Sequence, residues 1–406
     1  MSEQGVGYYE LEHGGKSMIR QKQEEVQAFL KEQGWDGWLI YDFRGTNPFA
    51  TKVFNHGATI LSRRWFIWIP AQGDIKILVH DIEFGSFPRL GFEVFKYNGR
   101  ESLGLELSKL LGGANRIAME YSPMANNPYV SKVDGGTLEL IRSLGVEVVS
   151  SGDLLQLFLA WTPEQLDNHL KAAAVLTETK DKAIAYIRQH ISEGTPLNEY
   201  QLQQYMNDFI ESQGMDPGHA PIIGFGPGGG DPHYVPAKTG SKVLEPGDAI
   251  LMDLFCKAPG DNPFADITWM AHYDTPTERF MKVFNAVLKS RDTAVELLQN
   301  RLSQGKLVRG YEVDLTTRKV LIDAGYEANL KHRTGHSLGN VTTHGEAAHF
   351  DGFETLDERA VLPGIGITIE PGVYFDDFGV RSEINVYAKA DGVDITTALQ
   401  TVIDIV

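Results

Sequence analysis

The chain is almost devoid of cysteine, because its 406 residues contain Cys256 alone. A single thiol excludes a disulfide within the chain and is typical of the reducing cytoplasm. No apolar run approaches the roughly 18–20 residues that a membrane-spanning helix requires, and residues 1–5 lack the basic and apolar regions of a secretory signal. We therefore expect a cytoplasmic protein with no membrane partner.

Positive charge is also scarce: 37 Lys and Arg residues stand against 54 Asp and Glu residues, for a net charge of −17. A balance of this sign provides no basic surface for nucleic acid. Internal repeats and low-complexity tracts are absent too, so the sequence predicts an ordinary globular protein. Single cores rarely grow beyond roughly 250–300 residues, so a chain of this length is expected to form two domains.

The apolar pattern changes character near residue 161. Before it, helices and strands are mixed, which indicates an α/β domain. The expected elements there are helices at 15–34 and 136–144 and strands at 37–41, 65–70, 75–80, 116–120 and 146–150. After it, Thr162 is a predicted N-cap with Pro163 at the first helical position. The sequence predicts domains 1–161 and 162–406.

In the second domain, two helix pairs are expected around a central sheet. The predicted helices are 163–194, 198–213, 276–302 and 311–324, and the predicted strands are 249–255 and 266–273. From residue 346 onward the chain is predicted to be loop and strand.

One histidine and four acidic residues lie in apolar, strand-like runs of this second half: Asp253, Asp266, His336, Glu370 and Glu383. An isolated buried charge costs many kcal/mol. Taken singly, each residue has an ordinary explanation, such as a backbone-bonded Asp, a turn Glu or a core His. As a set, they match the carboxylates and imidazole that hold a pair of divalent ions roughly 3.5–4 Å apart, which can activate water and polarise a carbonyl.

Three local motifs resemble those of the pita-bread metallopeptidases. They are Thr-Gly-His-Ser-Leu-Gly at 334–339, Thr-Ile-Glu-Pro-Gly-Val-Tyr at 368–374 and Gly-Val-Arg-Ser-Glu at 379–383. This superfamily includes Xaa-Pro dipeptidases (prolidases), Xaa-Pro aminopeptidases, methionine aminopeptidases and the metal-free creatinases. The resemblance implies an α/β (α+β) protein with a creatinase-like N-terminal domain at 1–161, a pita-bread catalytic domain at 162–406 and a homodimeric state.

By this resemblance, the metal ligands are Asp253, Asp266, His336, Glu370 and Glu383. Asp266 and Glu383 would contact both ions, and Glu370 would double as a proton shuttle to the leaving nitrogen. The resemblance implies two divalent ions, with Mn²⁺ expected first and Co²⁺, Zn²⁺ or Fe²⁺ as alternatives.

The resemblance assigns roles to five further residues. His233 is similar to the family histidine that faces the substrate, and His344 to the one that stabilises the developing oxyanion. Tyr374 and Arg381 are expected to contact the substrate, Arg381 also orienting the last ligand. His332 is expected just outside the ligands. Catalytic roles are implied for His233, His344 and Arg381, together with the shuttle glutamate.

Several positions depart from the family pattern. Phe255 replaces the glycine of Asp-x-Gly, and Trp269 replaces a basic residue, so both are expected to narrow the substrate pocket. The first two ligand aspartates are 13 residues apart (266 − 253), two more than usual. His344 follows His336 by eight residues rather than seven, and residues 345–358 lack an arginine for a dipeptide carboxylate.

The expected function is metal-dependent hydrolysis of the Xaa-Pro bond in short peptides. Three alternatives stay open: an Xaa-Pro aminopeptidase acting on longer peptides, a creatinase-like hydrolase of a small non-peptide C–N or ester substrate, and a non-catalytic binding module. The complete ligand set argues against the binding module, whereas the substituted positions keep the non-peptide hydrolase open.

Two other patterns have ordinary explanations. The glycine-rich residues 224–230 lack the Gly-Lys-Ser/Thr of a phosphate loop and are expected to form a flexible loop that delivers His233. Glu346, His349 and Asp351 suggest a third metal, but a solvated loop is the preferred interpretation.

Overall fold

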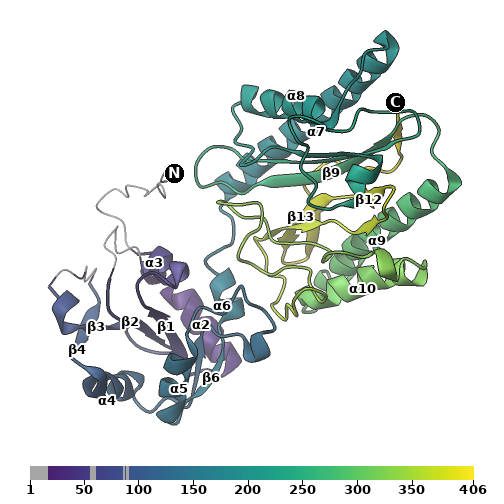
Figure 1. The fold of residues 1–406 in the computed structure, drawn as a ribbon. Helices are drawn as coiled ribbons and strands as arrows, with labels where there is room; N and C mark the ends of the chain where they lie inside the picture. The colour runs from purple at the N-terminus through teal and green to yellow at the C-terminus, as the bar shows by residue number, and fades with distance from the viewer. Residues whose placement is uncertain (1–16, 55–60, 86, 88–90) are drawn as a thin grey trace. The chain divides into compact units, whose positions relative to one another are not determined.

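The computed structural model describes residues 17–54, 61–85, 87 and 91–406, shown in Figure 1. Residues 1–5 and the first two residues of the expected helix at 15–34 lie outside this part. The chain divides into two compact units, the first ending at Phe158 and the second spanning Leu159–Val406, whereas the sequence predicts the division after residue 161.

The first unit is built on one mixed sheet with the strand order β4-β3-β2-β1-β5-β6. The β1–β2 and β2–β3 pairs are antiparallel, and β1–β5, β3–β4 and β5–β6 are parallel. The strands are β1 (Gly37–Asp42), β2 (Trp65–Pro70), β3 (Lys76–His80), β4 (Glu93–Tyr97), β5 (Arg116–Met119) and β6 (Glu147–Ser150).

Helices cover both faces of this sheet, so β1 is buried along its whole length. Trp38 and Ile40 pack into one core together with α1, α2, α3 and α6. Leu39 and Tyr41 point the other way, into the core beneath α4 and α5. The helices are α1 (Met18–Gln21), α2 (Gln23–Gln33), α3 (Pro48–Phe54), α4 (Arg100–Leu111), α5 (Gly135–Ser143) and α6 (Gly152–Gln156).

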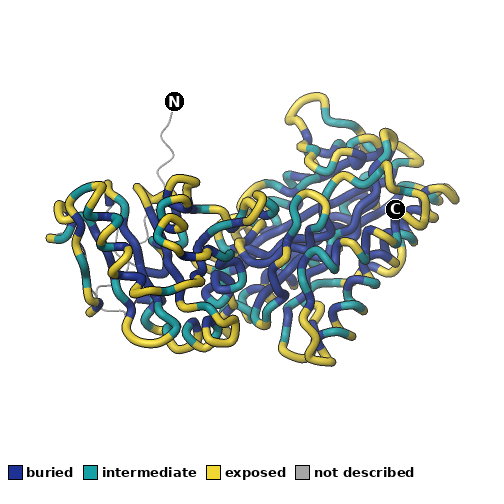
Figure 2. Tube along the Cα trace, turned by 90° about the horizontal axis from the view of Figure 1, so that it is seen from below, coloured by how far each residue is buried: buried dark blue, intermediate teal, exposed yellow. Residues whose placement is uncertain are grey.

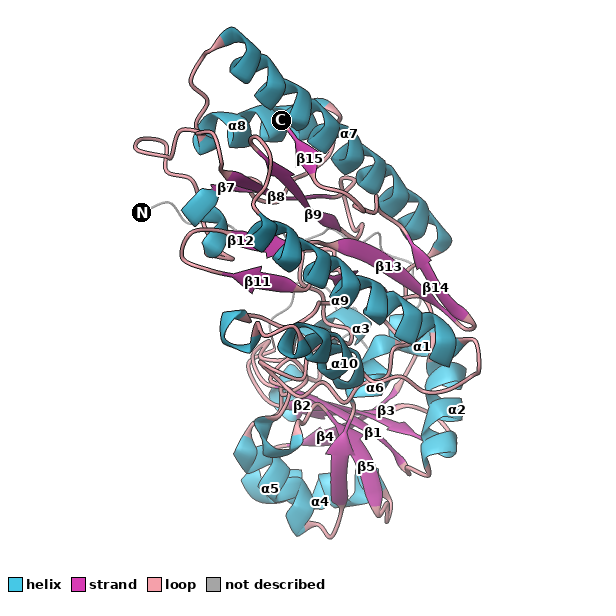
Figure 3. Ribbon diagram, turned by 90° about the vertical axis from the view of Figure 1, so that its right-hand side faces the viewer, coloured by secondary structure: helices cyan, strands magenta, loops and turns pink. Residues whose placement is uncertain are grey.

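In the second unit, two pairs of long helices enclose the strands (Figures 1 and 3). Helices α7 and α8 pack on the four-stranded sheet β15-β9-β8-β7, and α9 and α10 lie on the side of β11, β12 and β14. The predicted helix pairs are thereby confirmed. The helices are α7 (Pro163–Glu193), α8 (Glu199–Ser212), α9 (Glu278–Leu302) and α10 (Gly310–Asp323).

The strands of this unit form three sheets: the four-stranded one, β10-β13-β14 and β11-β12. They are β7 (Ile222–Phe225), β8 (Ala249–Cys256), β9 (Ala265–His272), β10 (Gly366–Ile369), β11 (Gly372–Tyr374), β12 (Gly379–Arg381), β13 (Ile384–Lys389), β14 (Gly392–Ile395) and β15 (Asp404–Ile405). Strands β8 and β9 are buried along their whole length, and Figure 2 shows the buried stretches of the trace in dark blue.

The two faces of the β8–β9 ladder have different roles. Its register pairs Asp253 with Thr268 and Phe255 with Asp266. Directly paired residues share a face, so these four side chains lie on one side of the sheet. The opposite side is apolar and packs against α7 and α8.

Trp269 belongs to this apolar side. Its ring packs in the core beneath α7 with the Lys180 ammonium 4.1 Å from the ring centroid. Its Nε1–H donates to Asp404 at 2.7 Å. The expectation that Trp269 narrows the substrate pocket is therefore wrong, because alternation along β9 turns it away from the carboxylates.

Among the described residues, none of the helices combines the length and apolar character needed to cross a bilayer.

Candidate active site

Asp266 is fixed by its backbone rather than by its side chain. Its N–H donates to Asn385 Oδ1 at 2.9 Å, and its carbonyl accepts from Asn385 Nδ2 at 2.7 Å. The buried carboxylate oxygen Oδ1 has no hydrogen-bond partner among the described residues. An unpaired buried carboxylate oxygen is costly, so this atom is ready to accept a cation.

His336 is held beside β10 with one ring nitrogen facing the acids. Its N–H donates to Thr368 Oγ1 at 2.9 Å, and its carbonyl accepts the Thr368 N–H at 2.8 Å. The ring atom Nδ1 lies 3.0 Å from the Ser337 carbonyl, which can only accept, so the proton sits on Nδ1. Burial, with His344 and Arg333 adding to it, lowers the pKa of His336 well below its usual value. Nε2 therefore carries a free lone pair.

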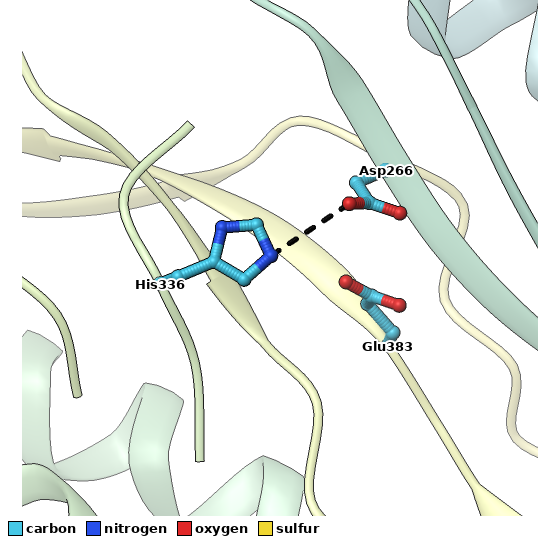
Figure 4. Close-up of side chains that lie close together, drawn as sticks. All are labelled: Asp266, His336 and Glu383. Atoms are coloured by element: carbon cyan, nitrogen blue, oxygen red, sulfur yellow. Dashed lines mark ion pairs between the residues drawn. The ribbon is translucent and has the colours of Figure 1, made fainter. Parts of the chain in front are cut away.

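Asp266, His336 and Glu383 converge on one point (Figure 4). One ligand atom from each lies within 4.8 Å of the others, and all three residues are buried. His336 Nε2 lies 3.8 Å from Asp266 Oδ2 and 3.4 Å from Glu370 Oε1. Two carboxylates and an imidazole lone pair at this spacing fit a divalent ion.

The carboxylates repel one another. Burial, followed by the charges of Glu383 and Asp253, raises the pKa of Asp266 well above its usual value. Burial and the charges of Glu370 and Asp253 do the same for Glu383. Burial raises the pKa of Glu370 to about 7, against the opposing effect of Arg381. A bound cation would relieve this repulsion.

Asp253 stands beside this group and pairs with Arg381. Arg381 Nη2 donates to Asp253 Oδ2, and Nε donates to Thr268 Oγ1 at 2.8 Å. Thr268 in turn donates to Glu383 Oε2 at 2.7 Å. Arg381 and Thr268 therefore link the acid on β8 to the acid that follows β12.

The same arginine reaches His332 through a tyrosine. Arg381 Nη1 donates to the Tyr374 oxygen at 3.3 Å, and the Tyr374 hydroxyl lies 2.7 Å from His332 Nε2. His332 Nδ1 faces the Arg333 carbonyl at 2.7 Å and so carries the proton. His332 therefore accepts from Tyr374, and the chain Asp253–Arg381–Tyr374–His332 is one hydrogen-bonded network.

His344 approaches the site from an exposed turn. Its ring centroid lies 4.0 Å from that of His336, and Arg333 Nη2 lies 3.2 Å from its Nδ1. A guanidinium can only donate, so Nδ1 accepts and the proton of neutral His344 is on Nε2. Partial burial, with Arg333 adding to it, lowers the pKa of His344 to about 4. This histidine is thus arranged as a neutral N–H donor.

His233 and Phe255 lie at the periphery of the site. His233 is exposed, and its backbone N–H donates to Asp231 Oδ1 at 3.1 Å. Phe255 shares the face of Asp253, and the exposed His219 ring covers it at 4.0 Å between centroids.

Sequence reasoning missed Arg333, Thr268 and His219. Arg333 lies three residues before His336, and this nearness to a predicted ligand could indicate a role in the site. Alternation along β9 places Thr268 on the same face as Asp266. For His219 the sequence gives no local signal.

The structure corrects two expectations about loops. The glycine run is not an open loop, because Gly226–Gly230 form a short 3-10 helix packed on β12. A Cβ on Gly230 would lie 2.2 Å from the Phe375 carbonyl oxygen. His349 and Asp351 are fully buried rather than solvated. His349 Nδ1 accepts the Ser337 N–H, and Asp351 accepts backbone N–H groups of residues 353–355.

Comparisons with known proteins agree on one family. The sequence pattern of metallopeptidase family M24 matches residues 168–390, more than half of the chain. An uncharacterized peptidase of Staphylococcus epidermidis is 26% identical over 242 residues, which are 58% of this chain and 61% of that protein. The chain thus spans less than two thirds of that relative. The "Probable dipeptidase PepE" of Mycobacterium tuberculosis is 25% identical over 75% of this chain and 78% of that protein.

Solved structures show the same fold over the whole chain. Dipeptidase PepE from Mycobacterium ulcerans has a TM-score of 0.65 at 22% identity and covers 96% of this chain and 98% of its own. Xaa-Pro dipeptidase from Bacillus anthracis has a TM-score of 0.57 at 20% identity and covers 96% and 100%.

Proposed function

The chain belongs to metallopeptidase family M24, and on that premise we propose that it hydrolyses the bond preceding proline in dipeptides. Its fold, an N-terminal α/β sheet domain followed by the pita-bread catalytic domain of that family, confirms the fold predicted from the sequence. Membership supports the coarser part of the proposal, which is a metallopeptidase that acts on a peptide substrate. The choice of Xaa-Pro dipeptides is the proposed part.

The observation that carries the proposal is the buried group of Asp266, His336 and Glu383 with ligand atoms within 4.8 Å. Family membership implies a divalent metal. Asp266 Oδ1, which has no hydrogen-bond partner among the described residues, and the lone pair on His336 Nε2 fit one. We assign two ions to this centre, held by these three residues together with Asp253 and Glu370.

Bound divalent ions supply Lewis acidity and an activated water at this point. The protein supplies the rest. His344 Nε2–H donates to the substrate carbonyl oxygen as negative charge develops there. The Glu370 carboxylate moves the proton to the leaving nitrogen of proline. Arg381 holds Asp253 and Tyr374 in place and keeps two further N–H groups for the prolyl end of the substrate.

Support for short substrates comes from the relatives and from the shape of the site. One relative and one solved structure carry the name dipeptidase, and another structure is an Xaa-Pro dipeptidase. The Phe255–His219 pair fills the carboxylate face beside Asp253, which limits the room for a long peptide. His233 is proposed to contact the substrate from the exposed side.

Metal-loaded enzyme should be tested on Xaa-Pro dipeptides, Xaa-Pro-Xaa tripeptides and non-proline dipeptides. We expect Xaa-Pro dipeptides to have the highest kcat/KM, a chelator to abolish turnover, and Mn²⁺ or Co²⁺ to restore it. A tripeptide preference of about tenfold, equivalent to about 1.4 kcal/mol, would favour the aminopeptidase. Failure on every prolyl peptide would favour a non-peptide substrate. Native Mn²⁺, a homodimer and a cytoplasmic location stay predictions.

A further inference from the structure

The two segments whose lengths depart from the family pattern lie against each other. The 13-residue spacing between Asp253 and Asp266 lengthens the β8–β9 connection (residues 257–264). The eight-residue spacing between His336 and His344 lengthens the histidine turn (residues 339–343). The β8–β9 connection and the histidine turn are therefore neighbours in the folded chain.

Three hydrogen bonds cross between these segments. Lys257 Nζ donates to the Asn340 carbonyl at 2.6 Å, and Asn340 Nδ2 donates to Asp261 Oδ1 at 2.9 Å. The Phe264 N–H donates to the Gly339 carbonyl at 3.0 Å. The histidine turn is thus attached along its side to the β8–β9 connection.

The β8–β9 connection is itself fixed to the rest of the unit. Lys257 exchanges two backbone hydrogen bonds of 2.9 Å with Asp216. At the start of α7, Gln165 Nε2 donates to the Asp261 carbonyl at 2.8 Å, and a His169 ring nitrogen lies 2.9 Å from the Phe264 carbonyl. The β8–β9 connection, on which the histidine turn packs, is therefore anchored both at Asp216 and at the start of α7.

The turn transmits this position to His344. Leu338 and His344 form a β-bridge, closed by the Gly339 N–H donating to the Thr343 carbonyl at 3.0 Å. The Gly345 N–H donates to the Ser337 carbonyl at 2.7 Å. Because these bonds tie the two arms of the turn to each other, a shift at residue 340 moves the backbone that carries the His344 ring.

Lys257 is an unusual residue for a purely structural contact. It is only 7% exposed, and burial of an ammonium is costly unless hydrogen bonds compensate it. Its Nζ donates to the Gly260 and Asn340 carbonyls and lies 5.5 Å from the Phe264 ring centroid. Both carbonyls belong to the two connected segments, so the charge serves to join them.

We propose that Lys257 is a positioning residue for His344. By attaching the histidine turn to the β8–β9 connection, it aims the His344 Nε2–H at the substrate carbonyl. The proposal rests on the proposed function, since it is His344 that would contact the reacting group.

The test replaces Lys257 by Met, which keeps most of the side-chain volume and removes the donor. Hydrogen exchange of residues 339–345 in the metal-loaded enzyme should become faster, with metal content unchanged. The value of kcat should fall about tenfold or more, since small misplacements of a catalytic group are costly, and KM should stay within about twofold. Lys257→Arg should restore part of the protection from hydrogen exchange and part of kcat.

A double-mutant cycle links the effect to the histidine. In a His344→Ala background, Lys257→Met should change the remaining kcat by less than about twofold, because the aimed group is gone. Lys389→Met is the matched control: Lys389 is a half-buried lysine on β13 that pairs with Asp394 at 2.7 Å, and its replacement should change neither exchange at 339–345 nor kcat.

Unchanged exchange at 339–345 in Lys257→Met would refute the attachment whatever the activity. An equal loss of kcat in both backgrounds would show that Lys257 acts without His344 and would refute the positioning role. Wild-type enzyme that cleaves no peptide would refute the proposed function instead, while the exchange comparison would still decide whether Lys257 holds the turn.

Discussion

Asp266→Asn should make the metal-free protein more stable and the metal-loaded protein less stable. Ligand atoms of Asp266 and Glu383 lie within 4.8 Å of each other. At an effective dielectric constant of about 20, two unit charges at this separation repel by about 3.5 kcal/mol. The substitution keeps the side-chain shape and removes one charge. It also supplies an amide N–H that can donate a hydrogen bond to the Glu383 carboxylate.

The gain should depend on pH. The pKa values of Asp266 and Glu383 are both raised, by burial first and by mutual repulsion next. The stability that such groups contribute is fully present below their unfolded pKa, near 4, and is lost as pH rises through the folded values. The metal-free wild type should therefore lose stability with rising pH, and the gap to Asp266→Asn should widen.

Metal should reverse the order. A ligand at 1,000 times its Kd stabilises the native state by about 4.1 kcal/mol, more than the repulsion that the substitution removes, and the amide is a poorer ligand than the carboxylate for a hard ion. Thermal unfolding at pH 6 to 9, with chelator and with Mn²⁺, measures the gain without metal and the loss with metal. Each kcal/mol should shift Tm by about 2–4 °C. The exposed Asp376→Asn is the control. The reasoning fails if Asp266→Asn is no more stable than wild type without metal at pH 9, or if Mn²⁺ shifts both equally.

Three other substitutions separate the roles of individual residues. His233→Ala should retain metal, as measured by elemental analysis, and lose turnover, because the exposed ring is proposed to contact the substrate. Arg333→Met should lower kcat about tenfold to a hundredfold by releasing the His344 ring, and Arg333→Lys should recover part of it in steady-state assays. Glu120→Ala should lower the free energy of unfolding by about 2–4 kcal/mol, because it leaves the Trp38 and Asn47 donors unpaired. Burial raises the pKa of Glu120 to about 7. The protonated side chain is therefore favoured in the folded state, and about 3 kcal/mol of the free energy of unfolding should be lost between pH 4.5 and 7 in denaturant titrations.

Local signals predict much of the fold. Helix α7 begins at Pro163 because Thr162 accepts the Gln165 N–H and the Gln165 side chain accepts in return. The single helix expected at 15–34 instead breaks at Lys22, where neither glycine nor proline marks the break. The sequence does not predict helix α4. Leu103 and Leu107 have helical spacing, but the N-cap, Gly99, has no side chain that would mark the start of a helix.

The site shows what sequence alone cannot supply. Motifs mark the candidate ligands, but the bond from Thr268 to Glu383 joins residues 115 apart, which only the folded chain reveals. Its nearness in sequence to Asp266 predicts that Trp269 lines the pocket. Its distance from Asp266 is an odd number of strand residues, so it faces the opposite side. Position along a strand, rather than proximity, decides which residues share a site.

The scattered origin of the proposed metal centre has a consequence for how the protein matures. Its three convergent residues are Asp266, His336 and Glu383, so assembling the centre closes chain segments of 70 (336 − 266) and 47 (383 − 336) residues. Each closure costs roughly 3–4 kcal/mol of chain entropy plus a constant. A growing chain cannot assemble the centre before residue 383 has left the ribosome. Metal capture should therefore be one of the last events in folding, and incorporation of the ion should report completed synthesis of the domain rather than guide its early steps.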